Sequence, residues 1–182
     1  GKNGVATVNG VVITKAHLDS EYHKFELQNP DFAKKGTKIQ SNVRKSLLNG
    51  LIDQELINQE AIKEGIKVTD NQIDESVKAT KAEYKSDSDF NEALNKVGMS
   101  EDDLQLQLRN SLLAQGLLSK LMEDYKVSDS DINKYYKKNY PSKEKLTTKL
   151  KSEIEEKLYL EKKQELNSNL LTRLKKQAKI IY

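Results

Sequence analysis

The chain has 182 residues, of which 36% are hydrophobic and 32% charged, and its formal net charge is only +3. This length suits one ordinary domain, or one domain with an extension, and the small net charge excludes a strong global field toward nucleic acid or anionic lipid. The absence of cysteine excludes disulfides and thiol chemistry, and no apolar run reaches the ~18 residues of a membrane-spanning helix.

The first residues predict a β-hairpin. Val5–Val8 and Val11–Ile13 are rich in β-branched residues and flank Asn9-Gly10, a pair that tolerates the positive φ angles of a tight turn. Two strands alone are marginally stable, so a third strand is expected elsewhere in the chain. The apolar, β-branched end Ile180–Tyr182 is the candidate.

The segment after the hairpin has a helical pattern. Thr14 is expected to cap a first helix, and residues 29–36 form a loop. From Lys38 to Lys63 the apolar residues recur at steps of three and four, which predicts an amphipathic helix. Gly65 should end this helix in the left-handed conformation. Four further helix starts are predicted by capping residues, namely Thr69, Ser86, Ser100 and Ser128.

A helix stop at Asn139-Tyr140-Pro141 is followed by a second long helical pattern. Apolar residues recur without interruption from Lys143 to Ala178. At 1.5 Å per residue this helix would be roughly 50 Å long.

Patterns that carry enzyme chemistry are missing from the sequence. His17 and His23 are six residues apart, a spacing that does not make them neighbours on one helix face, so we expect no metal site. No phosphate-binding glycine motif and no nucleophile motif occur, so we expect no catalytic residue and no cofactor. The lysines around Tyr135, Tyr136 and Tyr140 could form a platform for single-stranded nucleic acid. A helix end that packs one ring and solvates the others is the better interpretation, and we expect no nucleic-acid partner.

Four stretches, in the right order, resemble the SurA/PrsA-type extracytoplasmic peptide-binding chaperones. VATVNGVVITKAHLDSEY is similar to the start of their mature chains, and residues 47–75 to their "L…LI…LL…A…GI.VTD..I" segment. VSDSDINKYYKKNYP resembles their "VTD.EI..YY..N" helix, and residues 155–182 resemble their last helix and closing strand. The likeness covers nearly the whole chain.

The resemblance implies a mostly α fold: a multi-helix SurA-like chaperone module with a long C-terminal helix. A small β-sheet would join the N-terminal hairpin to the C-terminal strand. Residues 1–140 would form the helical chaperone region, and residues 143–182 would complete the same core. The parvulin isomerase domain that members of the family insert between these parts would be absent at the 141–142 junction, because no "RHIL" stretch is present. The chain would then not be an enzyme.

The resemblance also implies partners, a location and a mechanism. The chain would be an ATP-independent holdase that binds unfolded, partly folded or nascent secreted and envelope polypeptides. It would lie outside the cytoplasm, in a periplasm or on the outer face of the cell membrane. A lipid anchor outside this chain and a homodimer are both compatible with the resemblance.

A holdase needs an apolar hollow rather than a reaction centre. We expect a groove between the central helices and the N-terminal part. The candidate client-binding residues are flexible or aromatic side chains, namely Phe25, Phe32, Tyr84, Phe90, Met99, Leu113, Leu117 and Met122. Phe32 stands out because it lies in a polar loop.

Two other functions compete with the holdase. A helical scaffold would dimerise through residues 143–178 and bind no client. The spacing argues against it, because Leu146, Leu150, Ile154 and Leu158 step by four and drift away from a heptad seam. A prolyl isomerase is the third hypothesis, and it would need the domain that the sequence lacks.

Overall fold

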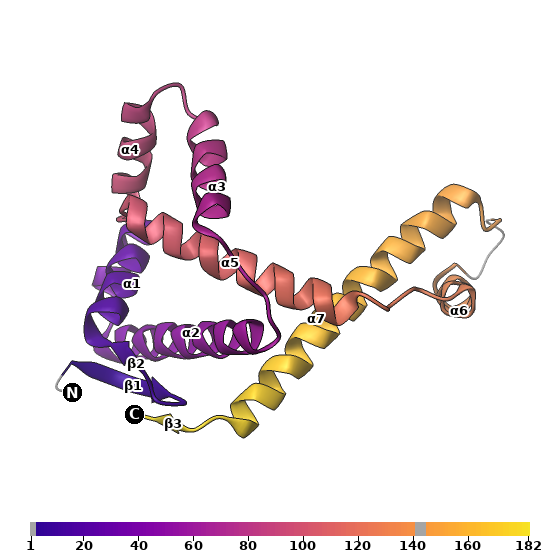
Figure 1. Ribbon diagram of the computed structural model, residues 1–182, viewed down its shortest axis with the longest axis horizontal. Helices are drawn as coiled ribbons and strands as arrows, with labels where there is room; N and C mark the ends of the chain where they lie inside the picture. The colour runs from indigo at the N-terminus through magenta and orange to yellow at the C-terminus, as the bar shows by residue number, and fades with distance from the viewer. Residues whose placement is uncertain (1–2, 141–144) are drawn as a thin grey trace. The chain divides into compact units, whose positions relative to one another are not determined.

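A computed structural model describes residues 3–140 and 145–182 of the chain (Figure 1). The fold is mostly helical with one small sheet, as predicted. Its elements in chain order are β1 (Gly4–Val8), β2 (Val11–Thr14), α1 (Lys15–Gln28), a 3-10 turn (Phe32–Lys34), α2 (Thr37–Lys63), α3 (Asp70–Ala82), α4 (Asp87–Lys96), α5 (Glu101–Met122), α6 (Asp129–Asn139), α7 (Thr148–Gln177) and β3 (Ile180–Ile181).

The chain divides into two compact units, which are described separately. Unit 1 consists of Gly1–Leu117 together with Leu174–Tyr182, and unit 2 of Leu118–Arg173. Unit 1 therefore draws on both ends of the chain. The arrangement predicted from the sequence, in which residues 1–140 and 143–182 share one core, stays a prediction.

The predicted pairing of the two chain ends is confirmed. The strands lie in the order β2-β1-β3, and Figure 1 shows the first and last strands side by side. On one edge β1 pairs antiparallel with β2, and on the other it pairs antiparallel with β3, where Thr7 faces Ile181 and Val8 faces Ile180. Val8 is fully buried in the middle strand.

Asn9 links the hairpin turn to two other parts of unit 1. Its φ of 51° fits the tight turn. Its side chain accepts a hydrogen bond from the backbone N–H of Lys179 at 2.9 Å and donates to Gln59 Oε1 at 2.9 Å. Gln59 in turn donates to the carbonyl of Val8 at 3.1 Å. One turn residue thus holds both the last strand and α2.

Phe32 is a core residue, which corrects the expectation that it stands exposed in a polar loop. Only 6% of it is exposed. Its ring packs edge-on against Tyr22 at 5.8 Å and against Phe25 at 4.9 Å, measured between ring centroids. The 3-10 turn folds the ring back onto α1, which is a tertiary contact that local polarity does not reveal.

The predicted helix ends are confirmed where capping residues mark them. Thr14 accepts a hydrogen bond from the N–H of His17, and Thr69 forms a complete capping box with Gln72. Gly65 follows α2 with a φ of +80°. Its N–H donates to the carbonyl of Ile62, which satisfies the end of the helix.

The last helix begins later than predicted. Helix α7 starts at Thr148, and Thr147 accepts a hydrogen bond from the N–H of Leu150 at 3.2 Å. The expected start at Lys143 lies outside the described residues. The apolar pattern extended the predicted helix because Leu146 fits its spacing, whereas a threonine cap sets the actual start.

Unit 2 is built from the end of α5, from α6 and from most of α7. Its most buried side chains are all apolar: Met122, Ile132, Ile154 and Leu170. Ser128 caps α6 by accepting from the N–H of Asp131. An ion pair of 2.7 Å between Lys151 and Asp129 joins α7 to the start of α6.

Replacing Gly98 and Gly50 with alanine should change the free energy of unfolding in opposite directions. Gly98 has a φ of +72°, and an added Cβ would lie 2.6 Å from Cδ1 of Leu27. Gly98→Ala should therefore lower the free energy of unfolding by about 1–2 kcal/mol. Gly50 lies inside α2 with nothing near an added Cβ, so Gly50→Ala should raise it by about 1 kcal/mol. Urea unfolding followed by circular dichroism measures both, and equal changes would contradict this account.

Asp103 should contribute stability that acid removes. A hydrogen bond from the backbone of Ser100 holds the pKa of Asp103 below its ordinary value of 3.8, and Lys24 adds to this effect. A folded pKa below the unfolded one stabilises the fold above about pH 4, and the stabilisation is lost as the pH falls through the folded pKa. Asp103→Ala should cost about 1 kcal/mol at pH 6, and the cost should shrink toward pH 2.

The matched control is Asp102→Ala, which removes the same charge from the same helix turn without touching the cap. Its cost, measured by urea unfolding at both pH values, should change less with pH. A cost for Asp103→Ala that stays constant between pH 6 and pH 2 would contradict the assignment.

Candidate functional site

Unit 1 contains a hollow of about 700 Å³. We call it the unit 1 hollow. Its walls come from β2, α1, α2, α5 and Met99, which precedes α5. The lining residues are Val12, Ile13, His17, Glu21, Lys24, Phe25, Gln28, Ser46, Leu47, Gly50, Leu51, Gln54, Glu55, Asn58, Met99, Asp103, Leu106, Gln107, Asn110 and Ser111.

Three helices each present one face to this hollow. The lining positions of α1 are 17, 21, 24, 25 and 28, those of α2 include 47, 51, 54 and 58, and those of α5 include 103, 107 and 110. Steps of four and three keep residues on one side of a helix. The hollow is therefore a space between three helix faces, and one wall ends at the sheet.

The apolar part of the lining is partly open to solvent. Val12 is 48% exposed and Leu106 is 45% exposed. Phe25, Leu47, Leu51 and Met99 are half-buried. Such side chains can lose further apolar area to a bound chain, at about 25 cal/mol for each Å².

Amide side chains form a second part of the lining. Asn58 on α2 donates to Asn110 Oδ1 on α5 at 2.9 Å, and Gln54 donates to Asn58 at 2.9 Å. Gln28 and Gln107 also line the hollow. Amides both donate and accept hydrogen bonds, so they can satisfy a polypeptide backbone of any sequence.

The charged part of the lining is centred on a half-buried lysine. Lys24 lies 2.9 Å from Glu21 and 3.4 Å from Asp103. Burial alone would lower the pKa of Lys24, but the hydrogen bond and charge of Glu21, with the charge of Asp103, raise it above its usual value. Glu55 is a third lining carboxylate, and it accepts from Gln59 at 2.6 Å. With His17 neutral, three carboxylates and one ammonium give the lining a formal charge of −2.

The structure brings two of the eight predicted client-binding residues into this hollow, namely Phe25 and Met99. Tyr84 is 38% exposed but lines another part of unit 1, where its ring packs 5.5 Å from that of Phe90. The other five are buried in the folded protein, and a role for them in client binding stays a prediction: Phe32, Phe90, Leu113, Leu117 and Met122.

Sequence reasoning missed much of the lining. Leu106 lies off the apolar stripe that Leu104, Leu108 and Leu112 suggest for α5. That offset signals an apolar residue outside the core, and it could have identified Leu106. The amides carried no comparable signal, because polar residues on a helix are usually solvated.

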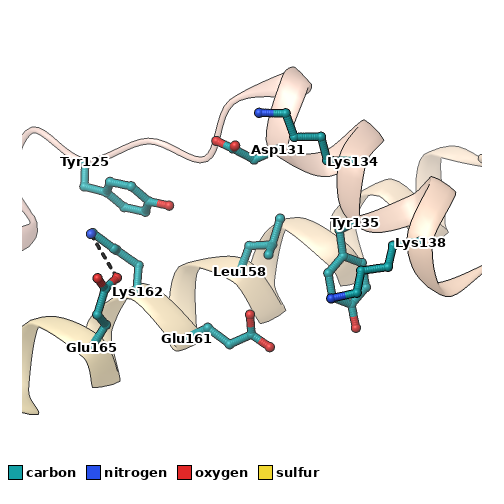
Figure 2. A pocket seen from close by; sticks show the side chains of 9 residues that line it. All are labelled: Tyr125, Asp131, Lys134, Tyr135, Lys138, Leu158, Glu161, Lys162 and Glu165. Atoms are coloured by element: carbon teal, nitrogen blue, oxygen red, sulfur yellow. Dashed lines mark hydrogen bonds and ion pairs between the residues drawn. The ribbon is translucent and has the colours of Figure 1, made fainter.

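Unit 2 contains a smaller cleft of about 530 Å³ between α6 and α7 (Figure 2). Figure 2 shows Tyr125, Tyr135 and Leu158 beside lysines and carboxylates from both sides, with Lys162 paired to Glu165 at 3.0 Å. Three lysines and three acidic residues line it: Lys134, Lys138, Lys162, Asp131, Glu161 and Glu165. The formal charges cancel, so the lining carries no net formal charge.

The tyrosine rings of unit 2 are engaged by the protein itself. Lys157 Nζ lies 5.0 Å from the ring centroid of Tyr135, and Lys162 Nζ lies 5.9 Å from that of Tyr125. Tyr136 and Tyr140 stack on each other at 5.9 Å. These contacts account for the cluster that the sequence presented as a potential base-stacking platform.

Metal-ligating clusters and membrane-spanning helices are two other features that can indicate a function. Residues 3–140 and 145–182 hold no group of three or more metal-ligating side chains. Within the same residues, no helix combines the length and apolar character needed to cross a membrane. Helices α6 and α7 are separated by residues 140–147, so no parvulin domain lies between them.

The chain is similar to known foldases. It is 28% identical over 149 residues to the foldase protein PrsA of Clostridium perfringens strain SM101, an alignment that covers 76% of this chain and 43% of the relative. It is 32% identical over 142 residues to PrsA of Caldanaerobacter subterraneus subsp. tengcongensis, covering 72% of this chain and 41% of the relative. The chain thus spans about two fifths of the length of these relatives.

The family match covers the part of the chain that builds the hollow. Residues 1–118 match the family described as the SurA-like N-terminal domain. They include every residue that lines the unit 1 hollow. The resemblance noted in the sequence is thereby confirmed, and the chain belongs to the SurA-like N-terminal domain family.

Proposed function

We propose that the chain is a holdase chaperone that binds unfolded or nascent polypeptides in the unit 1 hollow without ATP. The observation that carries the proposal is the hollow itself, which combines partly exposed apolar side chains with amide side chains. The name of its relatives, foldase protein PrsA, supports a role in protein folding.

The proposed mechanism is reversible burial of apolar surface. A client segment would cover Phe25, Met99 and Leu106, and its backbone groups would pair with the amides of Gln54, Asn58 and Gln107. Burial supplies the affinity, because apolar area leaves water on both partners. The flexible Met99 side chain adapts to different clients. No bond is made or broken, so the proposal assigns the chain no catalytic residue and no cofactor.

The proposal also covers location and assembly. The clients would be secreted or envelope proteins, and binding would take place outside the cytoplasm. Anchoring to the membrane by a lipid and dimerisation are further properties that the proposal leaves to measurement. A scaffold without client binding is the competing function, and it predicts no effect on aggregation.

Leu106→Gln should weaken client binding. The leucine is 45% exposed, so burying the rest of its surface is worth about 1 kcal/mol, or roughly fivefold in affinity. Suppression of aggregation of a guanidinium-unfolded reporter protein, without ATP, should need about five times more chaperone. Fluorescence anisotropy of a labelled unfolded peptide gives the same comparison at equilibrium.

The matched control is Ile62→Gln, which replaces an apolar residue that is 65% exposed on α2 and does not line the hollow. It should leave both measurements unchanged. Equal losses in the two variants would remove the hollow from the mechanism. No suppression by the unmodified chain at stoichiometric ratios would favour the scaffold.

A further inference from the structure

The outer edge of β2 is a second recognition element of the unit 1 hollow. We propose that an extended, cationic polypeptide segment adds to this edge as a fourth strand, along the border of the hollow. This inference rests on the proposed function and specifies the class of ligand and its mode of binding.

The backbone of Val12 is directed to the open edge. Val8 and Val11 flank the two-residue turn, so they form a hydrogen-bonded pair, and the next pair, Thr7 with Val12, does not. The N–H and C=O of Val12 therefore point away from β1. On the other edge of β1, Thr7 pairs with Ile181 of β3. Among the described residues no strand pairs with the outer edge of β2.

This edge carries neither charged residues nor proline, two features that usually prevent strand addition. Exposed edges are commonly protected by charged residues, by proline or by very short strands. The sequence of β2 is VVIT, with Val11 45% and Val12 48% exposed. The opposite edge of the sheet is formed by β3, which has only two residues. Strand β2 is thus the longer and less protected edge.

The hollow lies directly against this edge. Val12 and Ile13 both line it. The side chains of consecutive strand residues point to opposite faces of the sheet. Because Val12 and Ile13 both line the hollow, it lies beside the edge of β2 rather than over one face of the sheet. A strand added about 4.8 Å from β2 would run along the border of the hollow.

The charge of the lining selects the occupant. Glu21, Glu55 and Asp103 outnumber Lys24, so the lining carries a formal charge of −2. Like charges in such a site repel, and opposite charges attract. An extended segment that alternates apolar and basic residues fits both the half-buried apolar side chains and the surplus carboxylates.

The decisive experiment measures peptide binding to the unmodified chain. The probe is a fluorescein-labelled ten-residue peptide of alternating valine and lysine, followed by anisotropy. Two isomers carry backbone N-methyl groups, one on every valine and the other on every lysine. Strand addition uses the N–H groups of alternate residues only, so the isomers should differ in affinity by at least tenfold. Equal affinities, whether both retained or both lost, overturn strand addition.

A charge-reversed peptide tests the choice of occupant. Replacing every lysine with glutamate should weaken binding at least tenfold at low salt, and added salt should narrow the difference. Equal affinity of the two peptides at low salt overturns the cationic preference.

The protein side provides an independent test. Val12→Pro removes the outward N–H without removing a hydrogen bond to β1. It should lower the affinity for the valine–lysine peptide at least tenfold. The comparison variant Val12→Thr keeps the N–H and the β-branched shape, so it should bind the peptide at least threefold more tightly than Val12→Pro does. Equal binding by the two variants counts against strand addition, and the peptide isomers decide if the proline variant does not fold.

The outcomes separate this inference from the proposed function. If the unmodified peptide binds and aggregation is suppressed but the isomers are equal, strand addition fails and the holdase stands. If the peptide does not bind and aggregation is not suppressed, both fail.

Discussion

The fold of unit 1 depends on strand β1, which is the middle strand of the sheet. Its two edges are satisfied by strands from opposite ends of the sequence, and Val8 at its centre is completely buried. A two-stranded hairpin alone would be marginal. The third strand and the bonds of Asn9 to Lys179 and Gln59 turn the hairpin into a fixed platform.

The walls of the hollow are attached to that platform. Helix α1 begins at Lys15, directly after β2, with Thr14 as its cap. Helix α2 is held through Gln59 and through an ion pair of 2.8 Å between Asp53 and Lys175. Helix α5 is joined to α2 by the bond between Asn58 and Asn110, and to α1 by Lys24 and Asp103. The space between the three helices is therefore defined by specific bonds from the sheet outward.

The sequence predicted the elements better than the site. Helix starts at Thr14, Thr69, Ser86, Ser100 and Ser128 were predictable because a cap is a local contact between residues three apart. The pairing of Ile180 with β1 was predictable because an isolated hairpin needs a partner. The family resemblance supported the same arrangement.

The errors share a physical cause. Phe32 was placed in solvent because its neighbours are polar, yet Tyr22 and Phe25 enclose its ring. The burial of Leu113 and Leu117, and the exposure of Leu106 on the same helix, depend on which face of α5 meets its neighbours. Helix orientation is set by tertiary packing, which a single sequence does not specify. Candidate surface residues are therefore harder to identify than helix boundaries.

The pairing of Val8 with Ile180 has a consequence for the order of events during synthesis. Ile180 lies far behind Val8 in the sequence, so the hairpin is synthesised well before the strand that covers the free edge of β1. Until then that edge remains open to other chains. Bringing such distant residues together costs entropy that grows only slowly with their separation. Completion of the sheet therefore waits until Ile180 and Ile181 have been synthesised, and up to that point β1 is an exposed edge strand.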